Sequence, residues 1–132
     1  MSHWQNLSIE NKVAGILSSV PPYEEGHHMG RPFLTAYQLA IEYNRRHCGD
    51  VAILGLTVGG AGTGRYNSLA QYLARQLSQR ISDGDSPFEG GFLSNQHLKE
   101  MVFDDDGRDI TSSLIGTPLI TSVFRLRPNA IR

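Results

Sequence analysis

The sequence has too few cysteines for an internal disulfide and no apolar run long enough to cross a membrane. It contains a single cysteine, Cys48, so no disulfide can form within the chain, and this fits a reducing compartment. Its longest apolar run, residues 51–56, is far shorter than the roughly 20 residues of a membrane-spanning helix. Residues 1–25 lack the basic and apolar regions of a signal peptide. We therefore expect a cytoplasmic protein without a membrane partner.

Neither sign of charge dominates, because the formal net charge is -1. The charges are nevertheless unevenly distributed. Residues 26–82 carry six arginines against two carboxylates, whereas residues 83–109 carry eight carboxylates against two cations. Arginine accounts for ten of the twelve cations, and its planar guanidinium suits phosphates and base edges. The middle of the chain is therefore the candidate surface for a polyanion, while the acidic part is expected to face away or to contact a protein partner.

The motifs of common catalytic and metal sites are also missing. There is no G-x-S-x-G elbow, and His47 and Cys48 are adjacent at a helix end, so their side chains diverge. Histidines and carboxylates gather at residues 24–28, but neither C-x-x-C nor H-E-x-x-H spacing is present. We interpret residues 24–28 as a solvated loop and assign no catalytic residue, metal ligand or cofactor. An enzymatic activity is the less favoured interpretation.

A glycine-rich segment precedes the strongest helical pattern in the chain. A strand, a glycine loop and a helix N-terminus can together hold an anion through backbone N–H groups. Gly59 and Gly64 match the two glycines of a P-loop, but Arg65 and Tyr66 stand where its lysine and hydroxyl would be, and the dinucleotide pattern G-x-G-x-x-G is not met. Two interpretations remain: a flexible joint, or a nucleotide- or phosphate-binding loop formed by Gly60, Gly62, Gly64 and Arg65.

Hydrophobic periodicity predicts three helices in the first two thirds of the chain. The first covers residues 9–20. The second covers residues 33–47, or begins at Thr35 if Gln38 completes a capping box. The third is capped by Asn67 or Ser68, and its apolar stripe consists of Leu69, Tyr72, Leu73, Leu77 and Ile81. Between the last two helices, residues 51–58 are predicted to form a strand, with a short buried helix as the alternative.

The last third of the sequence predicts a small antiparallel sheet. Residues 82–91 read as a loop, and residues 97–103 and 108–115 as two strands joined by a turn at 105–107. Residues 119–126 are predicted to form a third strand. No interior stretch has the composition of a linker, so the prediction is one α+β domain over residues 1–132, with three helices followed by the sheet.

The third helix carries a row of polar side chains opposite its apolar stripe. Gln71, Arg75 and Gln79 follow one another at intervals of four, and glutamine and arginine are suited to adenine and guanine edges in a major groove. The order of two helices, a basic helix and a hairpin, together with the segment LTAYQLA at the start of the second helix, resembles a winged helix-turn-helix domain. The resemblance departs at residues 48–67, since a helix-turn-helix has a turn of about three or four residues.

These patterns favour a small domain that binds nucleic acid or another polyanion. The residues predicted to contact nucleic acid are Arg45, Arg46, Arg65, Gln71, Arg75 and Gln79. The alternatives are a protein-interaction or accessory module without catalytic activity, in which the polar row is an ordinary solvated helix face, and the phosphate-binding loop described above.

Overall fold

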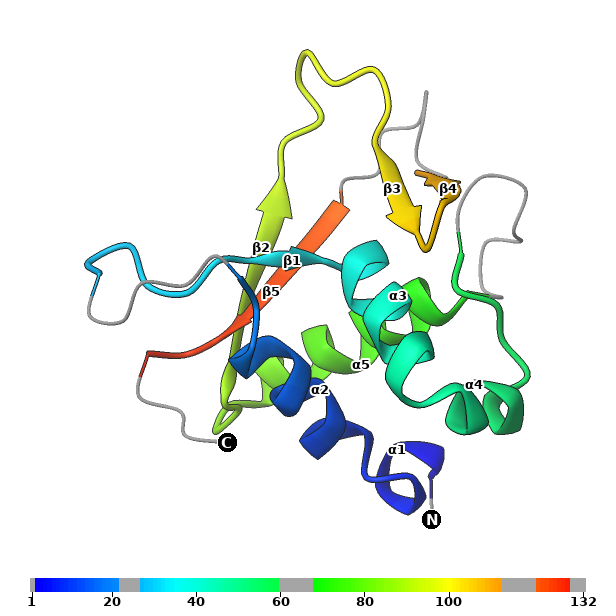
Figure 1. Ribbon diagram of the computed structural model, residues 1–132. Coiled ribbons are helices and arrows are strands. Elements are labelled where there is room, and N and C mark those ends of the chain that lie inside the picture. Colours follow the sequence, from blue (N-terminus) through cyan, green and yellow to red (C-terminus); the bar gives the residue numbers. More distant parts are fainter. Residues whose placement is uncertain (1, 22–26, 60–67, 113–120, 129–132) are drawn as a thin grey trace.

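The computed structural model describes residues 2–21, 27–59, 68–112 and 121–128. Its described helices are α1 (His3–Asn6), α2 (Ile9–Ser18), α3 (Ala36–Arg46), α4 (Cys48–Leu54) and α5 (Leu69–Asp83), and its strands are β1 (Leu34–Thr35), β2 (Phe88–Leu93), β3 (Val102–Asp105), β4 (Arg108–Thr111) and β5 (Thr121–Leu126). The fold is therefore α+β, as the sequence predicts (Figure 1). Within these residues, no helix has the length and apolarity needed to cross a membrane.

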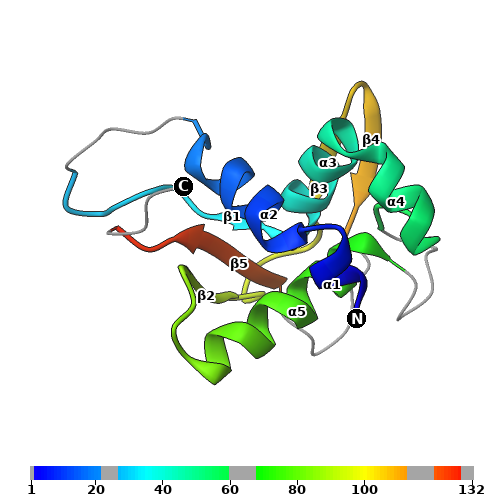
Figure 2. The same cartoon turned by 90° about the horizontal axis from the view of Figure 1, so that it is seen from below.

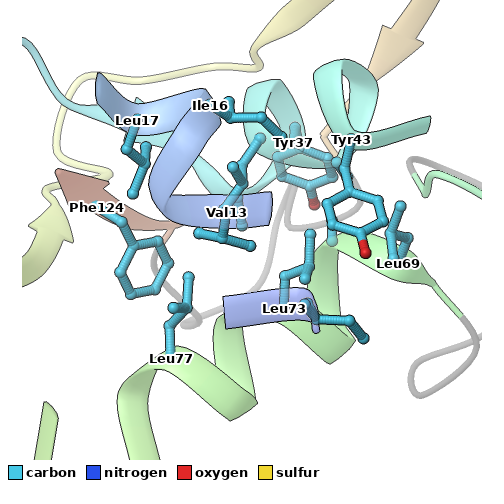
Figure 3. Close-up of a cluster of buried hydrophobic side chains, with 14 of the residues drawn as sticks. Val13, Ile16, Leu17, Tyr37, Tyr43, Leu69, Leu73, Leu77 and Phe124 are labelled. Carbon is cyan, nitrogen blue, oxygen red and sulfur yellow. The ribbon is translucent and has the colours of Figure 1, made fainter. Parts of the chain in front are cut away.

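The core lies where α2, α3 and α5 meet the sheet (Figure 3). Val13 and Leu17 of α2, Tyr43 of α3 and Phe124 of β5 are buried there. The apolar stripe of the third predicted helix is the core-facing side of α5: Leu69, Leu73 and Leu77 are fully buried, and Tyr72 and Ile81 are half-buried. Figure 2 shows α2 and α3 on one side of this core and α5 on the other.

The main sheet has three strands in the order β1-β5-β2, all antiparallel. The strand predicted at residues 119–126 is thus its central strand. The interpretation of residues 82–91 as a loop is wrong for their second half, because β2 begins at Phe88 and pairs with β5 in the register Phe88↔Leu126. The two glycines at positions 90 and 91 interrupt the alternation that would predict a strand. The sheet nevertheless requires a glycine at position 90, because a Cβ there would lie 3.0 Å from the ring of Phe124.

A separate two-stranded sheet is formed by β3 and β4. The strand predicted at residues 97–103 is wrong for its first five residues, because β3 begins at Val102. The turn lies within the predicted residues, and Asp106 and Gly107 both have positive φ, as a type I′ hairpin turn requires. The hairpin does not extend the main sheet. It folds back on α3, where the ring of Phe103 stacks on Tyr37 with 5.2 Å between centroids and Ile110 is buried.

The strand predicted at residues 51–58 is wrong, and the alternative short helix is correct for its first half. Residues Cys48–Leu54 form α4, which ends at Gly55 in the left-handed region with φ of 69°. A short apolar run does not distinguish a strand from a helix by periodicity. Here Val51 is the helix's one buried residue, whereas Ile53 is 58% exposed. The helix α1, which buries Trp4, has no counterpart in the predicted elements.

Local side-chain bonds fix the ends of the predicted helices. Thr35 and Gln38 form the complete capping box, so Thr35 is the N-cap and α3 begins at Ala36, one residue after the later of the two predicted starts. Ser68 is the N-cap of α5. The first predicted helix ends two residues early, at Ser18, because the Ser18 and Ser19 hydroxyls donate to the Gly15 carbonyl and compete with the helical ladder.

Candidate functional site

The polar row of α5 faces away from the core. Residues 71, 75 and 79 lie two positions beyond Leu69, Leu73 and Leu77, which places them about 200° around the helix from the buried stripe. Arg75 and Gln79 are exposed, and the Gln79 amide donates to Asp83 at 3.0 Å. Gln71 is half-buried, and among the described residues its Oε1 is buried without a hydrogen-bond partner. The exposed part of the polar row therefore consists of Arg75 and Gln79.

The N-terminus of α5 tests one part of the anion-loop interpretation. Its first three N–H groups already have protein acceptors: Leu69 donates to the Thr57 carbonyl at 2.6 Å, Ala70 to the Val58 carbonyl at 3.0 Å, and Gln71 to the Ser68 hydroxyl at 3.1 Å. This helix end consequently offers none of these three donors to a phosphate. The proposed loop residues Gly60, Gly62, Gly64 and Arg65 lie outside the described residues.

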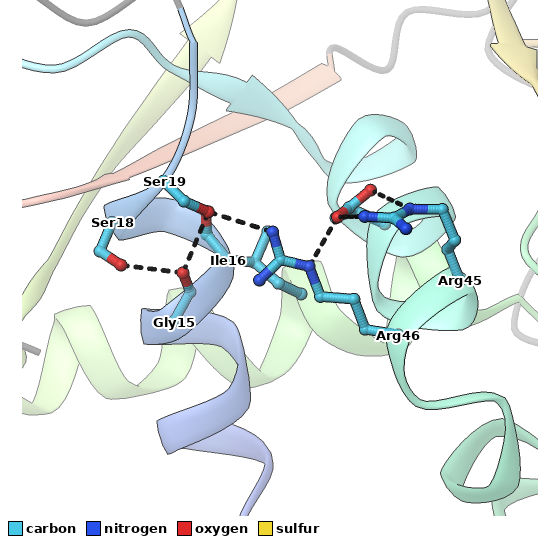
Figure 4. Close-up of polar contacts among 7 residues, drawn as sticks. Gly15, Ile16, Ser18, Ser19, Arg45 and Arg46 are labelled. Atoms are coloured by element: carbon cyan, nitrogen blue, oxygen red, sulfur yellow. Dashed lines mark hydrogen bonds and ion pairs between the residues drawn. The ribbon is translucent and has the colours of Figure 1, made fainter.

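Arg45 and Arg46 are both engaged by Glu42, which lies one turn earlier on α3. The Arg45 Nε donates to Glu42 Oε1 at 2.9 Å, and the Arg46 Nε donates to Glu42 Oε2 at 2.6 Å. Arg46 also reaches α2, where its Nη2 donates to the Ser19 hydroxyl at 3.1 Å (Figure 4). Hydrogen bonding by Arg45 outweighs partial burial and holds the pKa of Glu42 below its ordinary value. The cluster therefore contains two cations and one anion.

This cluster borders a groove of about 400 Å³ between the end of α2 and α3. The buried side chains of Ile16 and Val20 form its floor, and the half-buried Leu34 lies beside them. No sequence pattern indicates this groove, although the spacing of Glu42, three and four residues before the two arginines, does predict the ion pairs. Pattern reading gives no information on how the ends of two helices meet.

The structure places the predicted contact residues on two different faces. Arg45 and Arg46 border the α2–α3 groove, with α5 behind both helices in Figure 4. Arg75 and Gln79 lie on the far side of α5, since its opposite face packs into the core. The described members of the predicted set do not form one continuous surface, and Arg65 lies outside the described residues.

A second polar cluster fastens α4 to α2 and α3. Asp50 accepts from the Lys12 ammonium at 2.6 Å and from the Tyr43 hydroxyl at 2.7 Å. Burial opposes ionisation of Asp50, but these two hydrogen bonds outweigh it and lower the pKa of its carboxyl. Burial first, and then the hydrogen bond to Asp50, raise the pKa of Tyr43. Burial, followed by the nearby Lys12 charge, lowers the pKa of His47, whose ring lies 5.1 Å from that of Tyr43.

The histidine-rich segment and the acidic hairpin complete the predicted candidates. The rings of His27 and His28 stack at 4.3 Å, and no group of three or more potential metal-ligating side chains occurs within the part of the chain that the structure describes. On the hairpin, Asp104, Asp106 and Asp109 are exposed, while Asp105 pairs with Arg108 at 3.0 Å. The hairpin contacts α3 through its apolar side chains.

Comparison with known proteins gives no family assignment: no protein-family model, no curated protein and no solved structure matches this chain.

Proposed function

We propose that this chain is a DNA-binding domain of the winged-helix type that reads duplex DNA with the outer face of α5. The observation that carries the proposal is the order of the elements that build the core and the main sheet, α2-β1-α3-α5-β2-β5, combined with the sheet order β1-β5-β2. The helix α1 precedes this series, α4 is inserted between α3 and α5, and the β3–β4 hairpin is inserted between β2 and β5. In a winged helix-turn-helix domain, a short strand between the first two helices joins the antiparallel strands that follow the third helix, and this third helix is the recognition helix. The helix α5 holds that position here.

The chemistry of α5 supports duplex DNA as the ligand. Its 15 residues extend over roughly 22 Å and present Arg75 and Gln79 on the exposed side. Arginine bonds guanine O6 and N7, and glutamine bonds adenine N6 and N7. The major groove of B-DNA admits an α-helix, whereas that of A-form RNA is too deep and narrow for side chains to read. The half-buried Gln71 needs a different rotamer to take part.

The long connection before α5 is compatible with a fixed recognition helix. In place of the short turn of a helix-turn-helix, the chain has α4 and the segment that follows it. Thr57 and Ser68 form a parallel bridge, which ties this connection to the start of α5. Gly59 permits the close approach, because its φ is 132° and a Cβ there would lie 3.1 Å from the Ser68 Cβ. The helix thus has a defined anchor at its N-terminal end.

The experiment is selection of duplexes from a random pool, followed by titration of the enriched duplex and a scrambled one with wild type and with Arg75→Ala. Loss of a bidentate base contact is expected to reduce discrimination by about 1–3 kcal/mol and to leave non-specific binding nearly intact. Because Arg75 is exposed, its replacement should change the free energy of unfolding by less than about 0.5 kcal/mol.

Two matched variants sharpen this test. Gln79→Ala lies on the same face and should relax the preference at a different base pair. Arg45→Ala removes an exposed arginine from the groove side and should leave affinity and discrimination unchanged. The proposal is wrong if no duplex is enriched, or if Arg75→Ala and Arg45→Ala behave alike.

A further inference from the structure

The α2–α3 groove combines an aliphatic surface with a cationic edge. Its volume of about 400 Å³ lies within the range of about 300–1,000 Å³ typical of small-molecule sites. Its floor is formed by Ile16 of α2 and by Val20, which follows α2; they are 2% and 7% exposed. The half-buried Leu34 of β1 adds a third apolar side chain. Arg45 and Arg46 stand beside them. A ligand that fits both parts needs a short apolar body and one polar end.

The sign of that polar end follows from the charges at the edge. Two guanidinium groups stand against the single carboxylate of Glu42, so the edge keeps one net positive charge. A guanidinium has five N–H donors, and the four bonds to Glu42 and Ser19 use four of the ten that Arg45 and Arg46 provide together. Donors thus remain for a second anion, and arginine is well suited to the two oxygens of a carboxylate.

We propose that this groove binds a small aliphatic carboxylate, with the hydrocarbon chain against Leu34 above the floor formed by Ile16 and Val20, and the carboxylate on Arg45 and Arg46. The site is separate from the outer face of α5, because the helices α2 and α3 lie between the two (Figure 4). Binding in the groove does not depend on the DNA-binding proposal. Each of the two can fail while the other stands.

The probe is hexanoate, titrated into isotope-labelled full-length protein and followed by the amide resonances. Saturable shifts are expected at the end of α2 and along α3, within residues 16–20 and 38–46. Two matched compounds separate the contributions to binding. Acetate has the carboxylate without the hydrocarbon chain, and hexylammonium has the chain with the opposite charge. Both should bind at least about tenfold more weakly, since a charge-assisted hydrogen bond or two buried methylenes each correspond to that factor or more.

Arg45→Gln is the variant of choice, because the Arg45 side chain is 67% exposed and its loss should leave the fold intact. It should weaken hexanoate binding about tenfold or more. The double variant Arg45→Gln with Arg46→Gln should abolish it, with a melting curve to confirm folding. Arg108→Gln, an exposed and ion-paired arginine on the hairpin, is the control and should bind as wild type does.

The inference is overturned if hexanoate gives no saturable shifts in the groove, if hexylammonium binds as well as hexanoate, or if Arg45→Gln binds with wild-type affinity. Enrichment of a duplex in the selection experiment alters none of these outcomes. Conversely, hexanoate binding in a protein that enriches no duplex would leave the groove assignment in place and remove only the proposed function.

Discussion

At the scale of single residues, Asp50 makes the most consequential polar contacts in the helical part. Its carboxylate joins Lys12 of α2 and Tyr43 of α3 to the first turn of α4, where a negative charge also suits the helix dipole. Only 14% of the Asp50 side-chain surface is exposed, so water screens these contacts less than it screens the ion pairs of Arg45 or Arg108. Asp50 is therefore expected to contribute measurably to stability.

Replacing Asp50 with Asn should lower the free energy of unfolding by about 1–3 kcal/mol near neutral pH, because it removes charge-assisted hydrogen bonds. The sign of the pH dependence follows from the lowered pKa of the folded state. The stabilisation is complete above the ordinary value of 3.8 and is lost as the pH falls through the lower folded-state value. Urea unfolding across this range should show the two proteins converging in acid.

The control for this measurement is Asp109→Asn, an exposed hairpin carboxylate. It should change the free energy of unfolding by less than about 0.5 kcal/mol at every pH. A constant difference between wild type and Asp50→Asn down to the lowest pH would show that shape, and not charge, gives Asp50 its effect.

Some contacts of single residues cannot be predicted from the sequence. The sequence predicts Arg45 and Arg46 as contacts for nucleic acid, but it does not show that both pair with Glu42 or that they lie beside the end of α2. Likewise, Lys12 and Asp50 are 38 positions apart, so nothing local in the sequence predicts their ion pair.

At the scale of elements, the capping box of α3 is the clearest local signal that the structure confirms. Thr35 accepts from the Gln38 N–H at 3.2 Å, and the Gln38 side chain accepts from the Thr35 N–H at 2.8 Å. Thr35→Ala should cost about 0.5–2 kcal/mol of stability through loss of this cap. Thermal or urea unfolding measures it.

Thr35→Ser keeps the hydroxyl and loses only the methyl group, so it is the matched variant. It should retain most of the stability that Thr35→Ala loses. If the two variants are equally unstable, the contribution of Thr35 comes from packing of its methyl group in β1, where it is paired with Val123.

Local sequence patterns predict those elements that have a capping residue at the start and a continuous apolar stripe, as α3 and α5 do. The same patterns do not predict elements whose conformation depends on residues far away in the sequence. The helix α4 is stabilised by the burial of Val51 and by the contacts of Asp50 with α2 and α3. The strand β2 exists because β5 lies beside it, and its two glycines conceal the alternation that normally indicates a strand.

At the scale of the whole molecule, the acidic hairpin is held against α3 by a small apolar contact. Phe103 is half-buried and stacks on Tyr37, and the exposed carboxylates lie around it. Phe103→Ala should cost about 1–3 kcal/mol, less than a fully buried phenylalanine, and should loosen the hairpin selectively. Amide hydrogen exchange should accelerate in β3 and β4 while the pairing of β2 with β5 stays protected.

Phe103→Leu retains most of the apolar surface and removes the aromatic stacking, so it should keep the hairpin docked at a smaller cost. Equal protection of β3 and β4 in wild type and Phe103→Ala would contradict docking through this ring. A uniform rise in exchange across all strands would instead show that the hairpin is part of the main cooperative unit.

The class of the fold and its principal helices follow from periodicity, but the pairing of the strands does not. The sequence predicts a strand at residues 119–126 in the same small sheet as the two hairpin strands, whereas the hairpin forms a sheet of its own. In the structure that strand lies between β1 and β2 instead, with Leu34 opposite Phe124 and Phe88 opposite Leu126. A two-residue strand such as β1 is too short to show an alternating pattern. The packing of α2, α3 and α5 determines that the arginines at the end of α3 and the exposed side of α5 lie on different faces, and the sequence does not predict this packing.

The central position of β5 has a consequence for the order in which this chain acquires structure. Within the described residues, the strands β1 and β2 are not paired with each other, and each of them is paired with β5. During synthesis, the helices can form and pack locally, but the main sheet has no template until residues 121–126 have left the ribosome. Closing Leu34 onto Phe124 then joins positions about 90 residues apart, a costly loop closure that makes this pairing a natural slow step in folding.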